Sequence, residues 1–216
     1  MKLKEYPNAF LLEHPLLQHK ITLLRDKHTG TLQFRQVVKE VGLLEGYEVL
    51  KDLPTEMVEI TTPIEKASEP MIAGKKLCFV PILRAGMGML DGFLELVPNA
   101  KVGHIGLTRN EVTHEPIEYY CKLPYSLSER TVYLLDPMLA TGGSGIDAVT
   151  MLKKHGAKKI VFVCIIAAPE GVKAFSEKFP DVPVYFGALD RCLNENAYIC
   201  PGLGDAGDRI FGTVKK

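Results

Sequence analysis

The feature that most constrains the fold is a rhythm that begins after Gly74, where short apolar runs alternate with amphipathic segments. The runs are apolar at nearly every position, which is typical of strands buried on both faces of a sheet. They cover residues 77–83, 102–107, 131–135, 160–167 and 182–189, and the segments at 88–97, 144–155 and 169–179 have helical spacing. This order predicts an α/β fold with a central, mostly parallel sheet flanked by helices and joined by right-handed crossovers.

The first third of the chain has a different pattern. Leu, Ile and Val recur at intervals of three and four over residues 14–29 and 32–50, which predicts two helices separated at Gly30. The sequence Thr62-Pro63-Ile64-Glu65 predicts a third helix start, with Thr62 as its cap. Residues 109–128 and 190–209 match neither strand nor helix, and long irregular segments of α/β proteins often carry function.

Composition narrows the class of protein. The chain has 216 residues, 46% of them hydrophobic, and no obvious linker, so we expect a single domain spanning residues 1–216. Its 26 basic and 26 acidic residues cancel, which gives no overall attraction to nucleic acid. Five cysteines without C-x-x-C spacing favour a reducing, cytoplasmic setting. The longest apolar run, residues 160–168, is too short for a membrane span of about 20 residues.

The most informative segment is the run from Val132 to Gly145. A buried strand ends at Asp136, and a Thr-Gly-Gly-Ser turn at residues 141–144 then opens a helix. Glycines allow backbone N–H groups to approach an anion, the two hydroxyls add donors, and the positive end of the helix points to the same place. The pattern predicts a cradle for one phosphate and is neither a Walker loop nor a dinucleotide fingerprint. The alternative is that residues 144–147 are only a capping box.

Several motifs occur in a fixed order along the chain: Phe34-Arg35 with Gly46-Tyr47-Glu48, then residues 81–86, 105–111, 136–144 and 200–209. In these motifs the chain resembles the type I phosphoribosyltransferases and, within them, the uracil branch. The resemblance implies a helical N-terminal region, a long flap and a C-terminal hood that binds the base. It also implies transfer of the 5-phosphoribosyl group from 5-phospho-α-D-ribose 1-diphosphate to uracil, giving UMP and diphosphate in pyrimidine salvage.

The same resemblance implies Mg²⁺ as the cofactor, held mainly through the diphosphate, so no residue is assigned as a direct metal ligand. Related enzymes form dimers or tetramers, which predicts a homo-oligomer, and some respond to GTP, which leaves a GTP effector open. Neither nucleic acid nor a membrane is expected as a partner.

Site residues follow from the resemblance position by position. Arg84 and Arg109 are assigned to the leaving diphosphate, Asp136 to the ribose hydroxyls and Asp205 to Mg²⁺ or its waters, and these are the catalytic candidates. The full set for the phosphoribosyl donor is Arg84, Arg109, Asp136, Pro137, Met138, Leu139, Ala140, Thr141, Gly142, Gly143, Ser144 and Asp205, and the set for uracil is Ile199, Gly204, Asp205 and Ala206.

Other interpretations stay open at this point. Arg84 is also explained as a structural ion-pair partner, Arg109 as a surface arginine at the start of the flap, and residues 199–209 as a cluster of turns. Relatives usually have Tyr and Asp beside the flap arginine, where this chain has Thr108 and Asn110. The rival functions are a phosphoribosyltransferase for another base and a regulatory protein that binds RNA.

Overall fold

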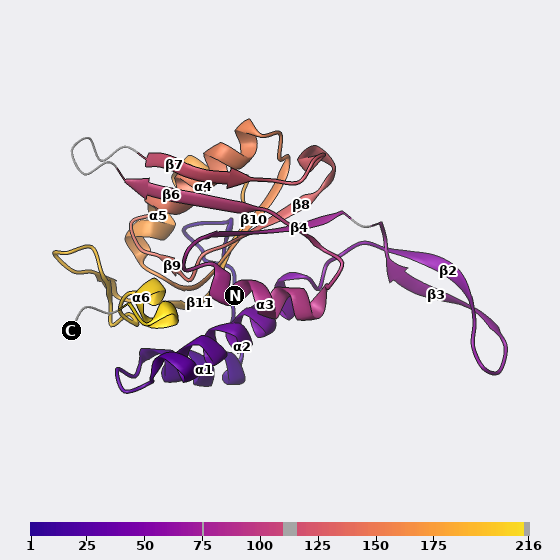
Figure 1. The fold of residues 1–216 in the computed structure, drawn as a ribbon, viewed down its shortest axis with the longest axis horizontal. Coiled ribbons are helices and arrows are strands. Elements are labelled where there is room, and N and C mark those ends of the chain that lie inside the picture. The colour runs from indigo at the N-terminus through magenta and orange to yellow at the C-terminus, as the bar shows by residue number, and fades with distance from the viewer. Residues whose placement is uncertain (75, 110–115, 214–216) are drawn as a thin grey trace.

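The computed structural model describes residues 1–216 except 75, 110–115 and 214–216, and it is built around one large sheet (Figure 1). Its strands are β1 (Ala9–Leu11), β4 (Leu77–Leu83), β5 (Lys101–Val102), β6 (His104–Arg109), β7 (Pro116–Lys122), β8 (Thr131–Leu135), β9 (Met138–Leu139), β10 (Lys159–Ala167) and β11 (Val184–Leu189). The order is β1-β11-β10-β8-β4-β6-β7, with β5 beside β4 and β9 beside β10. Every neighbouring pair is parallel except β6 and β7, so the predicted, mostly parallel sheet is confirmed.

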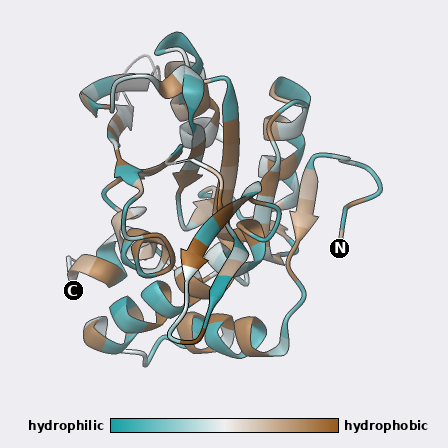
Figure 2. Ribbon diagram, turned by 90° about the vertical axis from the view of Figure 1, so that its right-hand side faces the viewer, coloured by the Kyte–Doolittle hydropathy of each residue, from teal (hydrophilic) through white to brown (hydrophobic). Residues whose placement is uncertain are grey.

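Alternate side chains of the central strands pack into two separate hydrophobic cores, one on each face of the sheet. Leu77 and Phe79 of β4 pack on the side of α1 (Pro15–Arg25), α2 (Thr31–Val49) and α3 (Met87–Leu96). Cys78 and Val80 pack on the side of α4 (Gly143–Lys154) and α5 (Pro169–Lys178). Figure 1 shows these two groups of helices on opposite faces of the sheet, and Figure 2 shows hydrophobic colour on the central strands and mixed colour along the helices. Burial on both faces explains why these strands are apolar throughout.

The helices and the main strands lie where the hydrophobic pattern predicted them, to within a few residues at α1 and within one or two elsewhere. Gly30 is the N-cap of α2, and His14 caps α1 by accepting a hydrogen bond from the Leu16 N–H at 3.2 Å. Among the helices of the described residues, none combines the length and the hydropathy required to cross a bilayer.

The predicted helix start at Thr62 is wrong. The hydroxyl oxygen of Thr62 does accept hydrogen bonds from the N–H groups of Ile64 and Glu65, at 3.1 and 3.0 Å. These bonds close a turn between the antiparallel strands β2 (Thr55–Thr61) and β3 (Lys66–Ile72). A Ser or Thr side chain makes the same local bonds at a turn and at a helix cap, so the motif alone does not separate the two. The hairpin stands away from the rest of the molecule (Figure 1).

The two stretches expected to be irregular contain regular structure. Strand β7 lies inside residues 109–128 and pairs with β6, followed by the short 3₁₀ helix η1 (Leu127–Glu129). Residues 190–209 include β12 (Cys192–Leu193), β13 (Ile199–Cys200) and the start of α6 (Ala206–Phe211). As an edge strand, β7 tolerates polar side chains and a proline at its first residue, which hides it from a search for apolar runs.

Candidate active site

A cavity of about 320 Å³ opens where β4 and β8 end, at the edge where parallel sheets bind ligands. Residues from the loops after both strands and from the C-terminal segment line it. They are Ile82, Leu83, Arg84, Ala85, Leu107, Asp136, Met138, Leu139, Ala140, Thr141, Gly142, Gly143, Ser144, Gly145, Asp205 and Gly207. Half of these residues are Gly, Ala, Ser or Thr, which suits a ligand that is held through backbone N–H groups.

The loop after β8 and the first turn of α4 form one wall of this cavity. Gly142 is the N-cap of α4 and has φ of 88°, in the left-handed region that glycine adopts without strain. The Gly143 N–H donates to the Thr141 hydroxyl at 3.4 Å, and the cap residue makes no side-chain bond. Since the helix already begins at Gly143, Ser144 is not its cap, and the capping-box interpretation is wrong. The helix instead presents its positive end to the cavity, where an anion is stabilised.

Asp136 follows the last residue of β8 and lines the same cavity. Burial raises the pKa of its carboxyl group to about 7, and a hydrogen bond with the Met138 backbone offsets part of that rise. A carboxyl group with this pKa is close to half protonated near neutral pH. Hydroxyl donors or a cation placed beside it would favour the charged form.

Arg84 follows β4, next to a cis peptide bond between Leu83 and Arg84. Its guanidinium lies 3.7 Å from the Asp208 carboxylate and 5.5 Å from the centre of the Phe211 ring. More than half of the Arg84 side chain is exposed, at 56%. Exposed ion pairs are worth about 0–1 kcal/mol, so the contact with Asp208 leaves the guanidinium available to an anion in the cavity.

The C-terminal segment contributes Asp205 and Gly207 to the cavity. One carboxylate oxygen of Asp205 also caps α6 by accepting from the Asp208 N–H at 2.8 Å. Of the residues assigned to uracil, only Asp205 belongs to the lining of the cavity, because Ile199 and Ala206 are buried behind it in the core. Gly204 is exposed beside them.

Two residues assigned to the phosphoribosyl donor are not part of the described cavity lining. Pro137 stands apart from the cavity lining, and its carbonyl accepts from the N–H groups of Ile165 and Ile166 at 3.0 and 3.1 Å. Arg109 is the last residue of β6, and its side chain falls outside the described part, as do residues 110–115 of the expected flap. The roles of Arg109 and of the flap stay predictions.

Sequence reasoning missed the groups that hold the C-terminal segment in place. Asp190 is almost fully buried, and its carboxylate accepts from Arg25 at 2.8 and 2.5 Å and from the Gly202 N–H at 2.8 Å. Arg25 also donates to the Gly202 carbonyl at 2.9 Å. Arg209 lies 4.1 Å from the Phe34 ring centre and donates to carbonyl groups of the α1–α2 region. The available signal was that Asp190 follows a buried strand as Asp136 does.

Comparison with known proteins decides the family. The family model described as Uracil phosphoribosyltransferase matches residues 11–213. The chain belongs to the uracil phosphoribosyltransferase family. A curated uracil phosphoribosyltransferase of Anoxybacillus flavithermus is 58% identical over 205 residues, which cover 95% of this chain and 98% of that protein. The predicted resemblance to this family is thereby confirmed.

Solved structures share the fold of this chain. A protein of Aquifex aeolicus has a TM-score of 0.91 and 43% identity, covering 96% of this chain and all of that one. The adenine phosphoribosyltransferase of Trypanosoma brucei, solved with AMP, pyrophosphate and ribose-5-phosphate, has a TM-score of 0.60 and 12% identity, covering 92% and 93%. The second likeness concerns the fold alone, and it confirms the predicted fold class.

Proposed function

We propose that the cavity between β4, β8 and the C-terminal segment carries out the reaction of the family: transfer of the 5-phosphoribosyl group from 5-phospho-α-D-ribose 1-diphosphate to uracil, giving UMP and diphosphate. The observation that carries this proposal is the coincidence of the family match with the cavity, which the phosphate loop, Asp136, Arg84 and Asp205 line together. Its volume of about 320 Å³ is at the lower end of ligand sites.

The phosphate loop is proposed to bind the 5′-phosphate of the donor. Residues 140–144 would supply backbone N–H groups and the hydroxyls of Thr141 and Ser144, at the positive end of α4. Asp136, which lines the same cavity before the phosphate loop, would accept hydrogen bonds from the ribose hydroxyls. Met138 and Leu139 also line the cavity. Pro137 would contribute indirectly, because its carbonyl group accepts hydrogen bonds from β10 and so holds the loop in place.

We propose that the diphosphate binds on the side of the cavity formed by the loop after β4 and by the C-terminal segment. Mg²⁺ prefers oxygen ligands and keeps several waters, and the carboxyl groups of Asp136 and Asp205 in one cavity fit that preference. When bound, Mg²⁺ neutralises charge on the diphosphate as the glycosidic bond breaks. Arg84 would add a guanidinium to the same charge, and Arg109 is assigned the same role on the flap. Asp205 would act through Mg²⁺ or its waters.

Uracil is proposed to lie against the main chain of residues 199–206, with Ile199, Gly204, Asp205 and Ala206 as its assigned neighbours. A backbone N–H and carbonyl match the carbonyl and N–H groups along one edge of uracil. Cytosine carries a donor where uracil carries an acceptor, and each such buried mismatch costs about 1–3 kcal/mol. The bonds from Arg25 and Asp190 to Gly202 support this role, since they fix the segment that would recognise the base.

Positioning and electrostatics account for the chemistry without an assigned general base. The anomeric carbon of the donor ribose develops positive charge as its bond to the diphosphate oxygen breaks. The nitrogen of uracil then forms a bond to that carbon, and its proton passes to solvent. Closure of the flap that begins at Arg109 would exclude water, which competes for the same carbon.

The test is formation of UMP by the purified protein from uracil and 5-phosphoribosyl 1-diphosphate with Mg²⁺. Parallel reactions contain a chelator, or cytosine, orotate or hypoxanthine in place of uracil. We expect turnover with uracil and Mg²⁺, none with the chelator, and loss of turnover in Asp136→Asn but not in the surface variant Asp181→Asn. Faster turnover of another base than of uracil would contradict the assignment of residues 199–206 to uracil recognition. Nucleotide or RNA binding without turnover would favour the regulatory protein.

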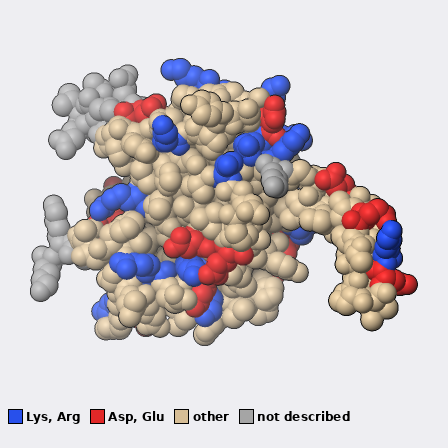
Figure 3. All heavy atoms as spheres, turned by 45° about the vertical axis from the view of Figure 1, so that its right-hand side comes forward, with Lys and Arg blue, Asp and Glu red and all other residues tan. Residues whose placement is uncertain are grey.

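Four further expectations belong to the same proposal: a single domain, a cytoplasmic location, a homo-oligomer and a response to GTP. The homo-oligomer is supported by the β2–β3 hairpin, where Met57, Ile64 and Met71 are 63%, 91% and 57% exposed. Figure 3 shows this hairpin reaching away from the body, with charged groups along its outer edge. Light scattering of the eluted protein tests the oligomer, and initial rates with and without GTP test the effector.

A further inference from the structure

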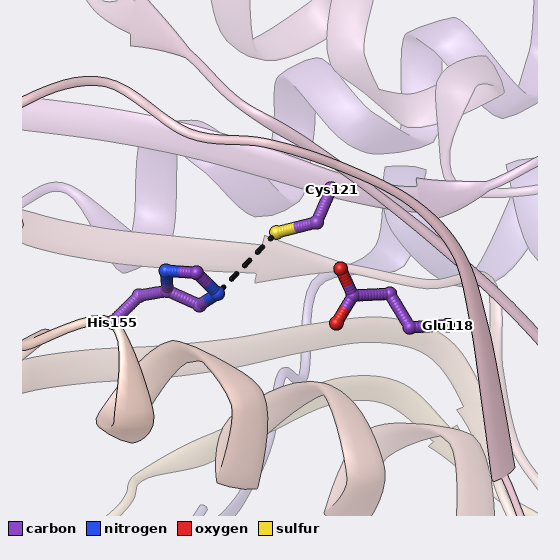
Figure 4. A group of neighbouring side chains, drawn as sticks. All are labelled: Glu118, Cys121 and His155. Atoms are coloured by element: carbon purple, nitrogen blue, oxygen red, sulfur yellow. Dashed lines mark hydrogen bonds between the residues drawn. The ribbon is translucent and has the colours of Figure 1, made fainter.

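Three side chains of different chemistry meet on the edge of the sheet, apart from the cavity described above. They are Glu118 and Cys121 of β7 and His155, the residue that ends α4 (Figure 4). One ligand atom of each lies within 4.8 Å of those of the other two, and the Cys121 Sγ is 3.7 Å from the His155 Nε2. Thiolate, imidazole and carboxylate are the three groups that bind zinc in proteins.

A β-bulge brings Glu118 and Cys121 to the same face of the strand. Residues three apart in a regular strand point to opposite faces. Here Ile105 pairs with Cys121 and Leu107 pairs with Glu118, so β7 has one more residue than β6 between the two pairs. Both side chains therefore share the face that α4 covers.

The bulge faces a glycine in the partner strand. A Cβ atom on Gly106 would lie 2.5 Å from a ring carbon of Tyr119, which is the extra residue of β7. Glycine at this position allows the Tyr119 ring to lie over it, whereas a larger residue would require the ring to move.

The end of α4 holds His155 at a fixed place opposite β7. The His155 N–H donates to the Met151 carbonyl at 3.0 Å, and the Ala157 N–H donates back to the Leu152 carbonyl at 3.0 Å. Gly156 takes φ of 89° to complete this helix end. Leu152 and Ala157 are buried, so the turn that carries His155 is anchored in the core.

The separation of the donors suits a tetrahedral ion. Two ligands at about 2.1 Å and 2.3 Å from a tetrahedral zinc ion lie about 3.6 Å apart. The distance of 3.7 Å between the Cys121 sulfur and the His155 nitrogen agrees with this value. Burial, and then the negative charge of Glu118, raise the pKa of the Cys121 thiol, and a cation between the two groups would stabilise both charges.

We propose that Glu118, Cys121 and His155 form a zinc-binding site, with water as the fourth ligand and with the thiol proton released to solvent on binding. The ion would tie β7 to α4, and so join the hairpin that carries Arg109 to the helix whose first turn lines the cavity. The site is about 18 Å from the start of α4, because the helix rises about 1.5 Å per residue. It is therefore separate from the Mg²⁺ of the reaction.

The test is titration of chelator-treated protein with Co²⁺, which accepts the same tetrahedral ligands and absorbs light through its bond to a thiolate. We expect one equivalent of Co²⁺ per chain, with thiolate-to-cobalt absorption that Zn²⁺ displaces. Cys121→Ser should abolish that absorption, whereas His155→Gln and Glu118→Gln should each raise the dissociation constant about tenfold or more. Zn²⁺ should raise the melting temperature of the natural protein and not that of Cys121→Ser.

Cys192→Ser is the matched control, since Cys192 is also a partly exposed cysteine on a strand. Its cobalt spectrum should equal that of the natural protein. The proposal is overturned if the natural protein gives no thiolate-to-cobalt absorption, if the absorption survives in Cys121→Ser, or if Cys192→Ser removes it. His155→Gln and Glu118→Gln change exposed side chains, so their fold is preserved, and equal Co²⁺ affinity in both variants and the natural protein would also overturn it.

Discussion

Asp190 offers the sharpest test of what holds the C-terminal segment over the cavity. Its side chain is 3% exposed and accepts three hydrogen bonds, two from Arg25 and one from the Gly202 N–H. Asp190→Asn keeps the size of the side chain but removes the charge and turns an N–H₂ group toward donors. Breaking a buried ion pair from one side costs about 3–5 kcal/mol. Arg25 is 24% exposed, which lets water solvate part of the guanidinium, so we expect a loss near 3 kcal/mol.

The assay is equilibrium urea unfolding followed by circular dichroism, at a fixed chain concentration and neutral pH. Asp181→Asn is the control, because its pair with Lys153 is as short, at 2.7 Å, but has side chains 36% and 62% exposed. That variant should lose less than about 1 kcal/mol. The double variant Arg25→Met with Asp190→Asn should regain about 1 kcal/mol or more relative to Asp190→Asn, since no unpaired charge remains.

Two results would refute this reasoning. One is a loss in Asp190→Asn no larger than that in Asp181→Asn. The other is a double variant whose loss is the sum of the two single losses, which would mean that Arg25 and Asp190 act independently. A raised KM for uracil in Asp190→Asn, with an unchanged KM for the donor, would tie the same bonds to recognition of the base.

Three further variants test the cavity and the core. Because burial raises the pKa of Asp136 to about 7, kcat/KM for the donor should rise with pH and level off above about 7 in initial-rate measurements, and a profile without an inflection near pH 7 would contradict this assignment. Thr141→Ala should raise the KM for the donor about tenfold, since a hydrogen bond to a charged group is worth about 1.5 kcal/mol or more; an unchanged KM would remove Thr141 from the phosphate site. Burial raises the pKa of Glu45 well above 4.5, so the stability from its neutral form is present below that pH and lost as pH rises through the raised pKa. Glu45→Gln should therefore match the natural protein in urea unfolding at pH 4 and be the more stable of the two at pH 8, and an equal pH dependence would contradict the burial of that charge.

Much of the sheet could be predicted because its strands are buried on both faces. β4 and β8 are apolar at almost every position, and α4 and α5 have a helical period, so local pattern and burial agree. The local structure of residues 136–144 could be predicted for a similar reason, because it depends on adjacent residues. A strand end, two glycines and a helix start are all local in the sequence.

The missed features depend on partners that are far away in the chain. The exposed hairpin β2–β3 has little apolar burial to give it a period, and its turn at Thr62 uses the bonds of a helix cap. The bulge in β7 is defined by its register against β6, at Gly106 and Leu107. The role of Asp190 could not be predicted because its partner, Arg25, is 165 residues away in the sequence.

The pairing of the two ends of the chain has a consequence for synthesis. β1 lies beside β11, Arg25 binds Asp190, and Arg209 donates to the Leu24 carbonyl, 185 residues earlier. Closing a chain loop of this length costs about 4.5 kcal/mol in entropy beyond a constant, so these contacts form after nearer ones. During synthesis, residues 136–144 leave the ribosome before Asp205 and the segment around it. The wall proposed to bind the donor can thus fold before the wall proposed to bind the base is completed.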